Sequence, residues 1–545
     1  MPEAPILPVA LERNAAADAP YLVFHAGEVQ RRLDAREAWV EARRWAAAML
    51  AAGARRGDRV PILLPTSKDF VGAFLGAQLA GAVPVPLPTP LTFGRLDRTI
   101  ERLDRIVTDA DARLLVSTGR YARAAGAHAG LTARLRGMLD PEALGTPRAP
   151  TRWPGVDADD LALLQYTSGT SGDPKGVEIT HRALAANTLA IAEALAIEPH
   201  DVGLSWLPVF HDMGLIGAIC TPVTRPFEVH SLAPEAFIMR PRRWLHTLGE
   251  VGATISPAPN FAYALCTSRI DRPDELRLDG WRAALNGAET VYAATLDGFS
   301  DRFARAGFRR DAFTPVYGLA ESTLVVTAPP PGRGPRETRF DVTALERGRA
   351  VEVDHGGRAL VSVGVPAAGA EVRIAGAGGP VDAGVVGEIQ TRGPSVMRGY
   401  FRRADASAAS LDDGWLRTGD LGFVHGGELY VKGRAKDLIV QSGRNVYPDD
   451  VEQIALLDPA VRGAAAAFAV SDERRGTDAL VVVVEVTERD PDTRARVAKA
   501  IRGRVLDALS VGVDEVALWP LGAIPRTTSG KVRRSACRDA WSRAS

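Results

Sequence analysis

The chain has 545 residues, enough for roughly three or four domain-sized units, and its 66 basic and 66 acidic side chains give a formal net charge of zero. That balance argues against binding to nucleic acid or to an anionic membrane surface. The three cysteines, Cys220, Cys266 and Cys537, are far apart and have neither a metal-ligand spacing nor a disulfide framework, so a reducing, cytoplasmic setting is expected.

The N-terminal stretch "MPEAPILPVALERN" has no basic residue before its apolar patch, so it lacks the charged region that opens a secretory signal. Apolar runs elsewhere are broken by glycine or proline before they reach the ~18 residues that a membrane-spanning helix needs. No integral membrane association is expected.

Up to about residue 330, apolar runs alternate with helical patterns. Residues 36–52 have helical periodicity and end at Gly53, and "HRALAANTLAIAEALA" predicts another helix. The apolar runs end in small or polar residues, which is typical of mostly parallel sheets whose ligands bind at the carboxyl ends of strands. These runs are "RVPILLP", "AVPVPLP", "RLLVSTG", "LALLQYTSG", "ATISPAPN", "RAALNGAE" and "FTPVYGLAE".

From about residue 360 the pattern changes to short alternating strands separated by glycines, such as "AEVRIAG" and "GELYVKG". This pattern predicts hairpins and a small barrel-like subdomain. After "GRAKD", helical and strand patterns alternate again in a compact α+β unit. The predicted fold is therefore α/β, with a large N-terminal domain of layered sheets over residues 1–434 and a small C-terminal domain over residues 435–545.

The strongest local signal is "YTSGTSGDPKG". Its glycines let backbone amides turn inward as an anion nest, while hydroxyls and a lysine add donors and charge. The G-x-x-x-x-G-K-[ST] phosphate-loop pattern fails, because the lysine lies between proline and glycine. The chemistry favours a polyphosphate over a merely flexible turn. The candidate ligands are Thr167, Ser168, Gly169, Thr170, Ser171, Gly172 and Lys175.

Three further stretches carry candidate polar groups in or at the ends of apolar runs. In "WLPVFHDMGLIG", His211 lies among apolar residues, which suits the mouth of an apolar pocket or a satisfied core histidine. The motifs "LNGAE" and "VYGLAES" end in Glu289 and Glu321. Such carboxylates can bind Mg²⁺ or cap a following helix.

Near the predicted hairpins, "GWLRTGD" and "VKGRAKD" place Asp420 and Arg434 in turns. A carboxylate there can accept two ribose hydroxyls and an arginine can clamp a ribose or a phosphate, although a turn aspartate and a solvated charge are the plain alternative. Only six of the 66 basic residues are lysine. Three of the six, Lys175, Lys436 and Lys531, lie in such glycine-containing motifs, which argues for a compact ammonium at working positions.

Taken together, the motifs resemble the acyl-adenylate-forming superfamily of acyl-CoA synthetases, peptide-synthetase adenylation domains and luciferases. "YTSGTSGDPKG", "YGLAE", "WLRTGD", "GRAKD" and "PRTTSGK" occur in that family's order over nearly the whole chain. "FHDMGLIG", "SGRNVYP" and "PRTTSGKVRRSACR" further resemble fatty acyl-AMP ligases. So does "TRFDVTALERGRAVEVDHGGRALVSVG", which is similar to the insertion that restrains the C-terminal domain there and disfavours reaction with coenzyme A.

The resemblance implies adenylation of a fatty acid with ATP and Mg²⁺, followed by transfer to a holo acyl carrier protein or to a carrier domain of a polyketide or peptide synthase. It assigns the phosphates of ATP to the loop from Thr167 to Lys175. The adenine contacts are assigned to Gly287, Ala288, Glu289, Tyr317 and Gly318, the Mg²⁺ contact to Glu321 and the ribose contacts to Asp420 and Arg434.

By the same resemblance, His211 stands between an acyl tunnel and the nucleotide, and Lys436 is the hinge of a mobile C-terminal domain. Lys531 reaches the carboxylate and the α-phosphate, so the expected catalytic residues are Lys531, Glu321 and His211. Ala320 replaces the threonine that many family members have before the motif glutamate, which removes one hydroxyl contact. Two alternatives stay open: a fatty acyl-CoA synthetase, and a degenerate acyl-adenylate-binding scaffold.

Overall fold

The computed structural model describes residues 5–26, 29–89, 96–167, 174–441, 444–472, 477–509, 511–527 and 530–544. The chain forms two compact units. The first comprises residues 1–336, 363–372 and 391–417, and the second comprises residues 337–362, 373–390 and 418–545. The predicted boundary between residues 434 and 435 lies within the second unit and stays a prediction.

The first unit contains a seven-stranded sheet with the order β13-β12-β11-β9-β10-β1-β2. Neighbouring strands are parallel except for β1 and β2 at one edge. Burial on both faces explains why most of these strands are near-continuous apolar runs in the sequence. The strands are β1 (Leu22–Ala26), β2 (Val29–Leu33), β9 (Val202–Ser205), β10 (Glu228–Leu232), β11 (Ile255–Ala258), β12 (Ala283–Asn286) and β13 (Phe313–Pro315).

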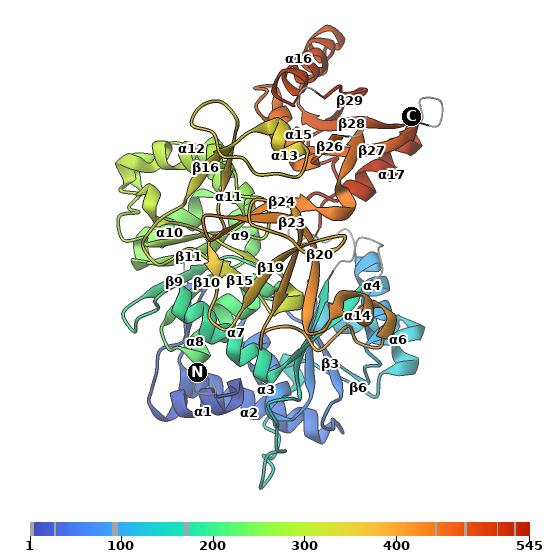
Figure 1. Ribbon diagram of the computed structural model, residues 1–545. Helices are drawn as coiled ribbons and strands as arrows, with labels where there is room; N and C mark the ends of the chain where they lie inside the picture. Colours follow the sequence, from blue (N-terminus) through green and yellow to red (C-terminus); the bar gives the residue numbers. More distant parts are fainter. Residues whose placement is uncertain are drawn as a thin grey trace. The chain divides into compact units, whose positions relative to one another are not determined.

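A second, four-stranded parallel sheet has the order β4-β3-β5-β6. Its strands are β3 (Arg59–Leu63), β4 (Val83–Pro86), β5 (Leu114–Ser117) and β6 (Gly137–Leu139). The helices of the first unit alternate with the strands of both sheets along the chain (Figure 1). They are α1 (Leu7–Ala16), α2 (Ala35–Ala51), α3 (Lys68–Leu79), α4 (Leu96–Asp109), α5 (Gly119–Ala127), α6 (Ala129–Arg134), α7 (His181–Ala194), α8 (Thr221–Thr224), α9 (Pro234–Met239), α10 (Arg242–Val251), α11 (Asn260–Arg269), α12 (Ala293–Phe303), α14 (Ala404–Ser410) and the π-helix η3 (Met213–Cys220).

The Ser/Gly-rich loop departs from the parallel pattern that the sequence predicts. It connects β7 (Leu161–Thr167) to β8 (Lys175–Thr180), and these two strands pair antiparallel as a hairpin. The chain therefore passes through a second, antiparallel strand, β8, before α7 begins. The reason is that periodicity identifies a buried strand but does not say which way its partner runs.

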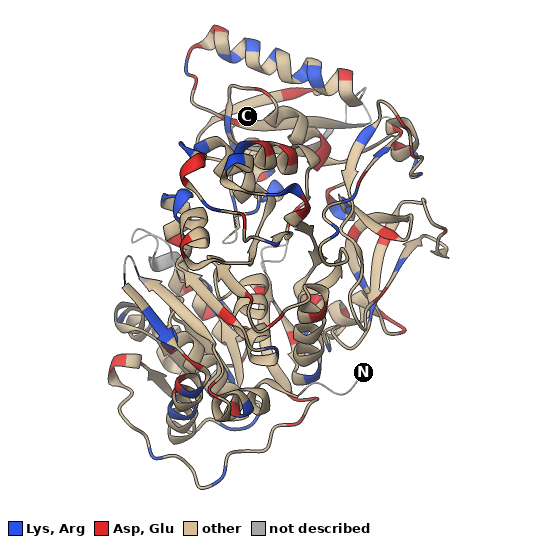
Figure 2. Cartoon of the chain, turned by 90° about the vertical axis from the view of Figure 1, so that its left-hand side faces the viewer, with Lys and Arg blue, Asp and Glu red and all other residues tan. Residues whose placement is uncertain are grey.

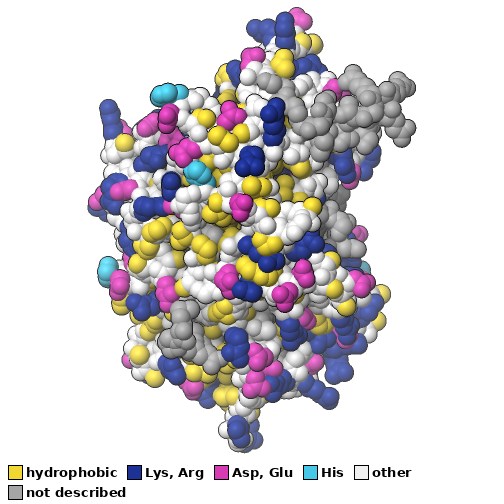
Figure 3. Space-filling model, viewed as in Figure 1, with side chains coloured by type: hydrophobic (Ala, Val, Ile, Leu, Met, Phe, Trp, Pro, Cys, Tyr) yellow, Lys and Arg dark blue, Asp and Glu magenta, His cyan; other side chains and the backbone are white. Residues whose placement is uncertain are grey.

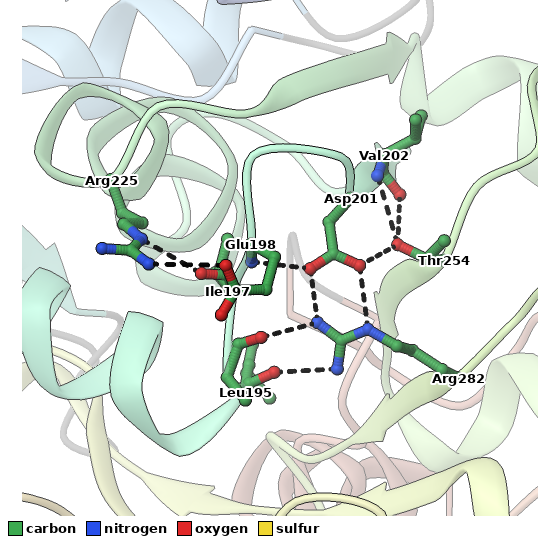
Figure 4. A network of polar contacts seen from close by, with 9 residues as sticks. Leu195, Ile197, Glu198, Asp201, Val202, Arg225, Thr254 and Arg282 are labelled. Carbon is green, nitrogen blue, oxygen red and sulfur yellow. Dashed lines mark hydrogen bonds and ion pairs between the residues drawn. The ribbon is translucent and has the colours of Figure 1, made fainter.

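A partly buried ion pair fixes the end of α7 to the seven-stranded sheet (Figure 4). Arg282 donates two hydrogen bonds to Asp201, at 2.8 and 2.6 Å, and also donates to the carbonyl of Leu195 at 2.8 Å. Burial raises the pKa of Asp201, but hydrogen bonds from Arg282, the Glu198 backbone and Thr254 outweigh it, so the net pKa is lowered. The helix that follows the hairpin is thus anchored at its far end.

The second unit contains the antiparallel pair β23 (Trp415–His425) and β24 (Glu428–Arg434). It also contains a three-stranded sheet with the order β27 (Val461–Asp472), β28 (Thr477–Val486) and β29 (Glu515–Pro520). Successive side chains of this sheet point to opposite faces, and both faces are covered. Ala465 and Val482 pack with residues of α15 (Pro448–Leu456) and α16 (Pro491–Leu509), whereas Ala466 and Val483 pack with Cys537 of α17 (Arg534–Ala544). Figure 2 shows basic residues recurring along α16.

The remaining elements of these regions include short strands and turns. They are β14 (Tyr317–Gly318), β15 (Val325–Ala328), β16 (Glu337–Phe340), α13 (Val342–Glu346), β17 (Arg358–Val361), β18 (Val365–Pro366), β19 (Glu371–Gly376), β20 (Gly379–Pro380), β21 (Gly387–Arg392), β22 (Leu411–Asp412), β23 (Trp415–His425), β24 (Glu428–Arg434), β25 (Ile439–Gln441), β26 (Arg444–Val446), α15 (Pro448–Leu456), β27 (Val461–Asp472), β28 (Thr477–Val486), α16 (Pro491–Leu509), β29 (Glu515–Pro520) and α17 (Arg534–Ala544).

Basic and acidic side chains are intermixed over the face seen in Figure 3, in keeping with the zero net charge. Within the part of the chain that the structure describes, no helix is both long enough and apolar enough to cross a membrane.

Candidate active site

The Ser/Gly-rich loop connects two paired strands of the first unit. Thr167 at the end of β7 and Lys175 at the start of β8 lie directly opposite each other. Lys175 is half-buried, and its ammonium lies 4.9 Å from the centre of the Tyr400 ring. Five predicted phosphate ligands lie outside the described residues, and their role stays a prediction: Ser168, Gly169, Thr170, Ser171 and Gly172.

Residues 397–403, here called the strap, run beside β8. The backbone N–H of Glu178 donates to the carbonyl of Gly399 at 2.9 Å, and that of Phe401 donates to Gly176 at 2.8 Å. The strap is therefore fixed to a strand that flanks the loop. Three strap arginines add ion pairs: Arg398 with Glu178 at 3.0 Å, Arg402 with Asp111 at 2.9 Å and Arg403 with Asp109 at 2.8 Å.

Glu321 lies in a short turn after β14 whose backbone is strained. Thr323 has φ 66° and ψ −64°, and the Leu324 N–H donates to the Ser322 carbonyl at 2.8 Å. This is the rare γ-turn with positive φ, and strain of this kind clusters at functional sites. The Tyr400 hydroxyl donates to Glu321 Oε1 at 2.9 Å. Lys175 and Glu321, predicted separately from the sequence, thus contact the same aromatic side chain.

Gly287 lets the first predicted adenine motif pack against Val316 beside the second, and Gly318 lets the second motif turn back closely on Leu324. A Cβ on Gly318 would lie 1.8 Å from the Leu324 carbonyl oxygen, and a Cβ on Gly287 would lie 2.7 Å from Val316 Cγ2. Only glycine fits at Gly318, because the obstructing atom belongs to the backbone. The structure therefore brings these motifs together, while their contact with adenine stays a prediction.

Ala288 and Glu289 follow β12 directly. Ala288 has φ 68°, a left-handed conformation that is uncommon for alanine. The Glu289 carboxylate accepts a hydrogen bond from the backbone N–H of Phe261 in the first turn of α11. The contacted helix α11 precedes Glu289 in the chain, so this contact is not the cap on a following helix that the sequence allowed. The contact of Glu289 with adenine stays a prediction.

His211 precedes η3, and a neighbouring carboxylate orients its ring. Its Nδ1 lies 2.6 Å from Asp212 Oδ1, which also accepts the Met213 N–H at 2.7 Å. This contact favours the proton on Nδ1 and leaves Nε2 for another partner. The Gln165 side chain of β7 donates to the Phe210 carbonyl at 2.8 Å, so the histidine loop is tied to the strand that leads into the Ser/Gly-rich loop.

In the second unit, Asp420 and Arg434 are register partners on β23 and β24. Arg434 Nε lies 3.0 Å from Asp420 Oδ1. The aspartate side chain is 10 % exposed and the arginine side chain 49 %, so the arginine covers a carboxylate that still reaches solvent. The sequence predicts both residues in turns, whereas the structure places them on paired strands, and their contact with a ribose stays a prediction.

Lys436 is an exposed residue of the turn that follows Arg434. Lys531 is half-buried in a tight loop that its own backbone closes. The Thr527 N–H donates to the Lys531 carbonyl at 2.7 Å, and the Lys531 N–H donates to Thr527 Oγ1 at 3.0 Å. Within the described residues, no ion pair engages the Lys531 ammonium.

Arg534, three residues after Lys531, joins the end of the Lys531 loop to acidic residues elsewhere in the second unit. It donates two hydrogen bonds to Glu452, at 2.6 and 2.7 Å, one to Asp449 at 2.8 Å and one to Asp437 at 3.1 Å. Asp437 adjoins the predicted hinge lysine. Bidentate contacts of this kind are among the strongest side-chain hydrogen bonds.

The insertion-like segment lies in the second unit with the C-terminal residues. Phe340 packs against Phe423 and Tyr430 with ring centres 5.0 and 5.4 Å apart. Arg358 forms an ion pair with Asp450 of α15. The segment is therefore attached both to the β23–β24 hairpin and to the first helix of the C-terminal region.

Within the described residues, no group of three or more histidine, cysteine or carboxylate side chains is arranged as a metal site. Beside the loop, Glu321 offers one carboxylate, with Oε1 already oriented by Tyr400. This donor set fits Mg²⁺, which proteins often hold through one or two carboxylates together with water and substrate phosphates.

Tyr400 is not among the site residues that the sequence motifs predict. The residue lies in "MRGYFRR", between two predicted hairpins, with no local pattern of apolar periodicity. In the sequence, Tyr400 is only an aromatic residue that follows a glycine and lies among arginines, and this pattern is too common to indicate a site. Only the long-range contacts to Lys175 and Glu321 reveal its position.

Residues 11–401 match the family model of the AMP-binding enzymes, and the chain belongs to this family. It is 36% identical over 513 residues to the medium-chain fatty acid ligase for acyl carrier protein, JamA, of Moorena producens, covering 89% of this chain and 85% of that protein. It is 38% identical over 527 residues to a putative acyl-CoA synthetase of Caulobacter vibrioides, covering 93% of this chain and 89% of that protein.

Among solved structures, the chain is similar to one from a study of the fatty acyl-adenylate ligases of E. coli and L. pneumophila. The TM-score is 0.92, the sequence identity is 33%, and the match covers 99% of this chain and 98% of the other. The α/β fold of an adenylate-forming enzyme, predicted from the ordered motifs, is confirmed.

Proposed function

We propose that this chain is a fatty acyl-AMP ligase, which activates a fatty acid with ATP and then loads it on the phosphopantetheine thiol of an acyl carrier protein. The observation that carries the proposal is the joint placement of Lys175 and Glu321 beside the Ser/Gly-rich loop in a member of the AMP-binding enzyme family. The named function of JamA and the structural match support a fatty acid substrate and a carrier-protein acceptor.

In the first half-reaction, a carboxylate oxygen of the fatty acid attacks the α-phosphorus of ATP. The bond from that phosphorus to the bridging oxygen breaks and pyrophosphate leaves, with no proton transferred. Such a step depends on positioning and charge stabilisation. The Lys531 ammonium, which has no ion-pair partner among the described residues, would reach the carboxylate and the α-phosphate.

Thr167 and Lys175, with the loop between them, would hold the β- and γ-phosphates. Glu321 would bind Mg²⁺, which supplies charge neutralisation on the phosphates. Asp420 would accept the ribose hydroxyls with Arg434 as its support, and His211 would border the acyl group.

In the second half-reaction, the carrier thiol sulfur attacks the acyl carbonyl carbon. The bond from that carbon to the AMP oxygen breaks, and the thiol proton passes to solvent. We assign residues 435–545 as a domain that turns about Lys436 between the two half-reactions. The Arg534 contacts with Asp437 and α15 support movement of the Lys531 loop together with that domain.

A carrier protein is favoured over free coenzyme A by the insertion-like segment. Arg358 ties this segment to Asp450 and donates to Gln453 at 3.2 Å, both on α15. A segment attached at both ends resists rearrangement of the C-terminal region. The match to a putative acyl-CoA synthetase keeps coenzyme A as the competing acceptor.

The deciding experiment incubates the protein with ATP, Mg²⁺ and fatty acids of several lengths, first measuring fatty-acid-dependent exchange of pyrophosphate into ATP. A scaffold without turnover gives no exchange. Coenzyme A or a holo acyl carrier protein is then added as acceptor, with the apo carrier protein as the control. Acyl transfer to the holo carrier protein is expected, and efficient acyl-CoA formation would refute the carrier-protein assignment.

A further inference from the structure

Tyr400 touches two oppositely charged groups of the site through different parts of its side chain. Its hydroxyl donates to Glu321 Oε1 at 2.9 Å, while the Lys175 ammonium lies over its ring face, 4.9 Å from the centre. The ring carries negative potential on its face, and the hydroxyl carries the donor proton. Each end of the side chain therefore matches the charge that it meets.

Lys175 and Glu321 do not neutralise each other in the structure. Within the described residues, no ion pair joins them, although both are half-buried and both contact the same tyrosine. Each group instead contacts Tyr400, the ammonium through the ring face and the carboxylate through the hydroxyl. Each charge therefore stays available for a ligand of opposite sign.

The backbone around Tyr400 is well anchored. Val177 of β8 forms an antiparallel bridge with Tyr400 itself. On the next residue, the Phe401 ring faces Arg59 at 5.3 Å and Arg402 at 5.4 Å. The strap ion pairs fix the same segment at three further points.

We propose that Tyr400 is a positioning residue that separates Lys175 from Glu321 and orients both for a nucleotide carrying a divalent cation. The inference rests on the proposed adenylation at this site. The ring keeps the ammonium for phosphate oxygens, and the hydroxyl holds the carboxylate for the cation. No atom of Tyr400 takes part in bond making, so its role is exerted through the other two side chains.

Two substitutions separate these contributions. Tyr400→Phe keeps the ring and removes the hydrogen bond to Glu321, so binding of ATP with Mg²⁺ is expected to weaken about tenfold while binding of ATP in EDTA is unchanged. Tyr400→Leu removes the ring as well, which lets Lys175 pair with Glu321. Binding of ATP in EDTA is then expected to weaken about fivefold, because that ion pair must first be broken.

A second-site substitution tests the cause. In the Tyr400→Leu protein, Glu321→Gln removes the carboxylate that would capture Lys175, so binding of ATP in EDTA is expected to recover. A purely structural role for the tyrosine predicts no recovery. Phe401→Leu is the matched control, because it changes an aromatic strap residue that contacts neither charged group.

Isothermal titration calorimetry with ATP, in Mg²⁺ or in EDTA and without fatty acid, measures these affinities directly. Thermal melting of each free variant checks the fold, and KM for ATP in pyrophosphate exchange should rise more than kcat falls. The proposal is overturned if Tyr400→Leu binds ATP in EDTA like the unsubstituted protein, if Glu321→Gln fails to restore binding, or if Phe401→Leu gives the same losses. Absence of fatty-acid-dependent exchange in the unsubstituted protein would instead refute the proposed function.

Discussion

Lys175 and Lys531 carry the same charge but are supported in different ways. Lys175 begins a strand whose neighbours include an aromatic ring and an ion-paired strap. Lys531 lies in a short loop closed by its own backbone, and one arginine fastens the base of that loop to the second unit. The first arrangement suits a fixed phosphate cradle, and the second suits a group that is delivered and withdrawn with its own domain.

The largest effect is expected from Lys531→Ala. If the ammonium stabilises charge in the adenylation step, its removal should reduce pyrophosphate exchange about a hundredfold or more, without changing thermal stability. Lys499→Ala, at an exposed position of α16, is the matched control and should keep full pyrophosphate exchange. Unchanged pyrophosphate exchange in the Lys531 variant would show that the Lys531 ammonium does not act in adenylation.

The next largest effect is expected from Arg534→Ala. The substitution leaves the buried Glu452 without its cation, which should cost about 3–5 kcal/mol of stability. The loosened loop should also lower kcat for adenylation about tenfold with little change in KM for ATP. Urea unfolding and exchange kinetics measure both effects, and Arg533→Ala, an exposed neighbour, is the control. A change in KM alone would contradict a role through the Lys531 loop.

A smaller effect, on acceptor choice, is expected from Arg358→Ala. Loss of the ion pair with Asp450 should free the insertion-like segment from α15 and raise acyl-CoA formation a few-fold, roughly the effect of one partly buried ion pair. Loading of the holo carrier protein measured in parallel should change less. Arg347→Ala, an exposed position of the same segment, serves as the control. Equal changes with both acceptors would argue against restraint by this contact.

The sequence predicted the local elements well, because apolar periodicity determines them. It predicted Asp420 and Arg434 in turns beside hairpins, whereas the two residues are register partners on adjacent strands. It did not predict that β7 and β8 form a hairpin, because pairing direction depends on residues beyond the apolar run.

Tyr400 could not be predicted for a different reason. Its hydrogen bond to Glu321 spans 79 positions along the chain, and its contact with Lys175 spans still more. Propensity and motif spacing report on neighbours in sequence, whereas this residue acts through tertiary packing. The Arg534 contacts could not be predicted either. Lys531, three residues earlier, already accounted for the motif in which the arginine lies.

The smallest effect concerns the stability in acid of the first unit, at the start of the helix that follows the strand of Lys175. His181, the first residue of α7 after β8, is 2 % exposed, and burial lowers its pKa to about 4, against a smaller opposing influence of Asp160. Because the folded pKa lies below the ordinary value near 6.5, the folded state binds fewer protons than the unfolded state in this range. Its stability contribution is therefore complete above pH 6.5 and is lost as the pH falls towards 4.

Between pH 7 and pH 5 this residue should cost the first unit about 2 kcal/mol of stability. His181→Gln should remove most of that pH dependence, while His200→Gln, at an exposed position, should retain it. Urea unfolding midpoints at the two pH values measure the difference. If the His181 variant loses as much stability on acidification as the unsubstituted protein, the acid sensitivity of the first unit arises from other groups. The stability of the β7–β8 hairpin and α7 then does not depend on a neutral His181 ring.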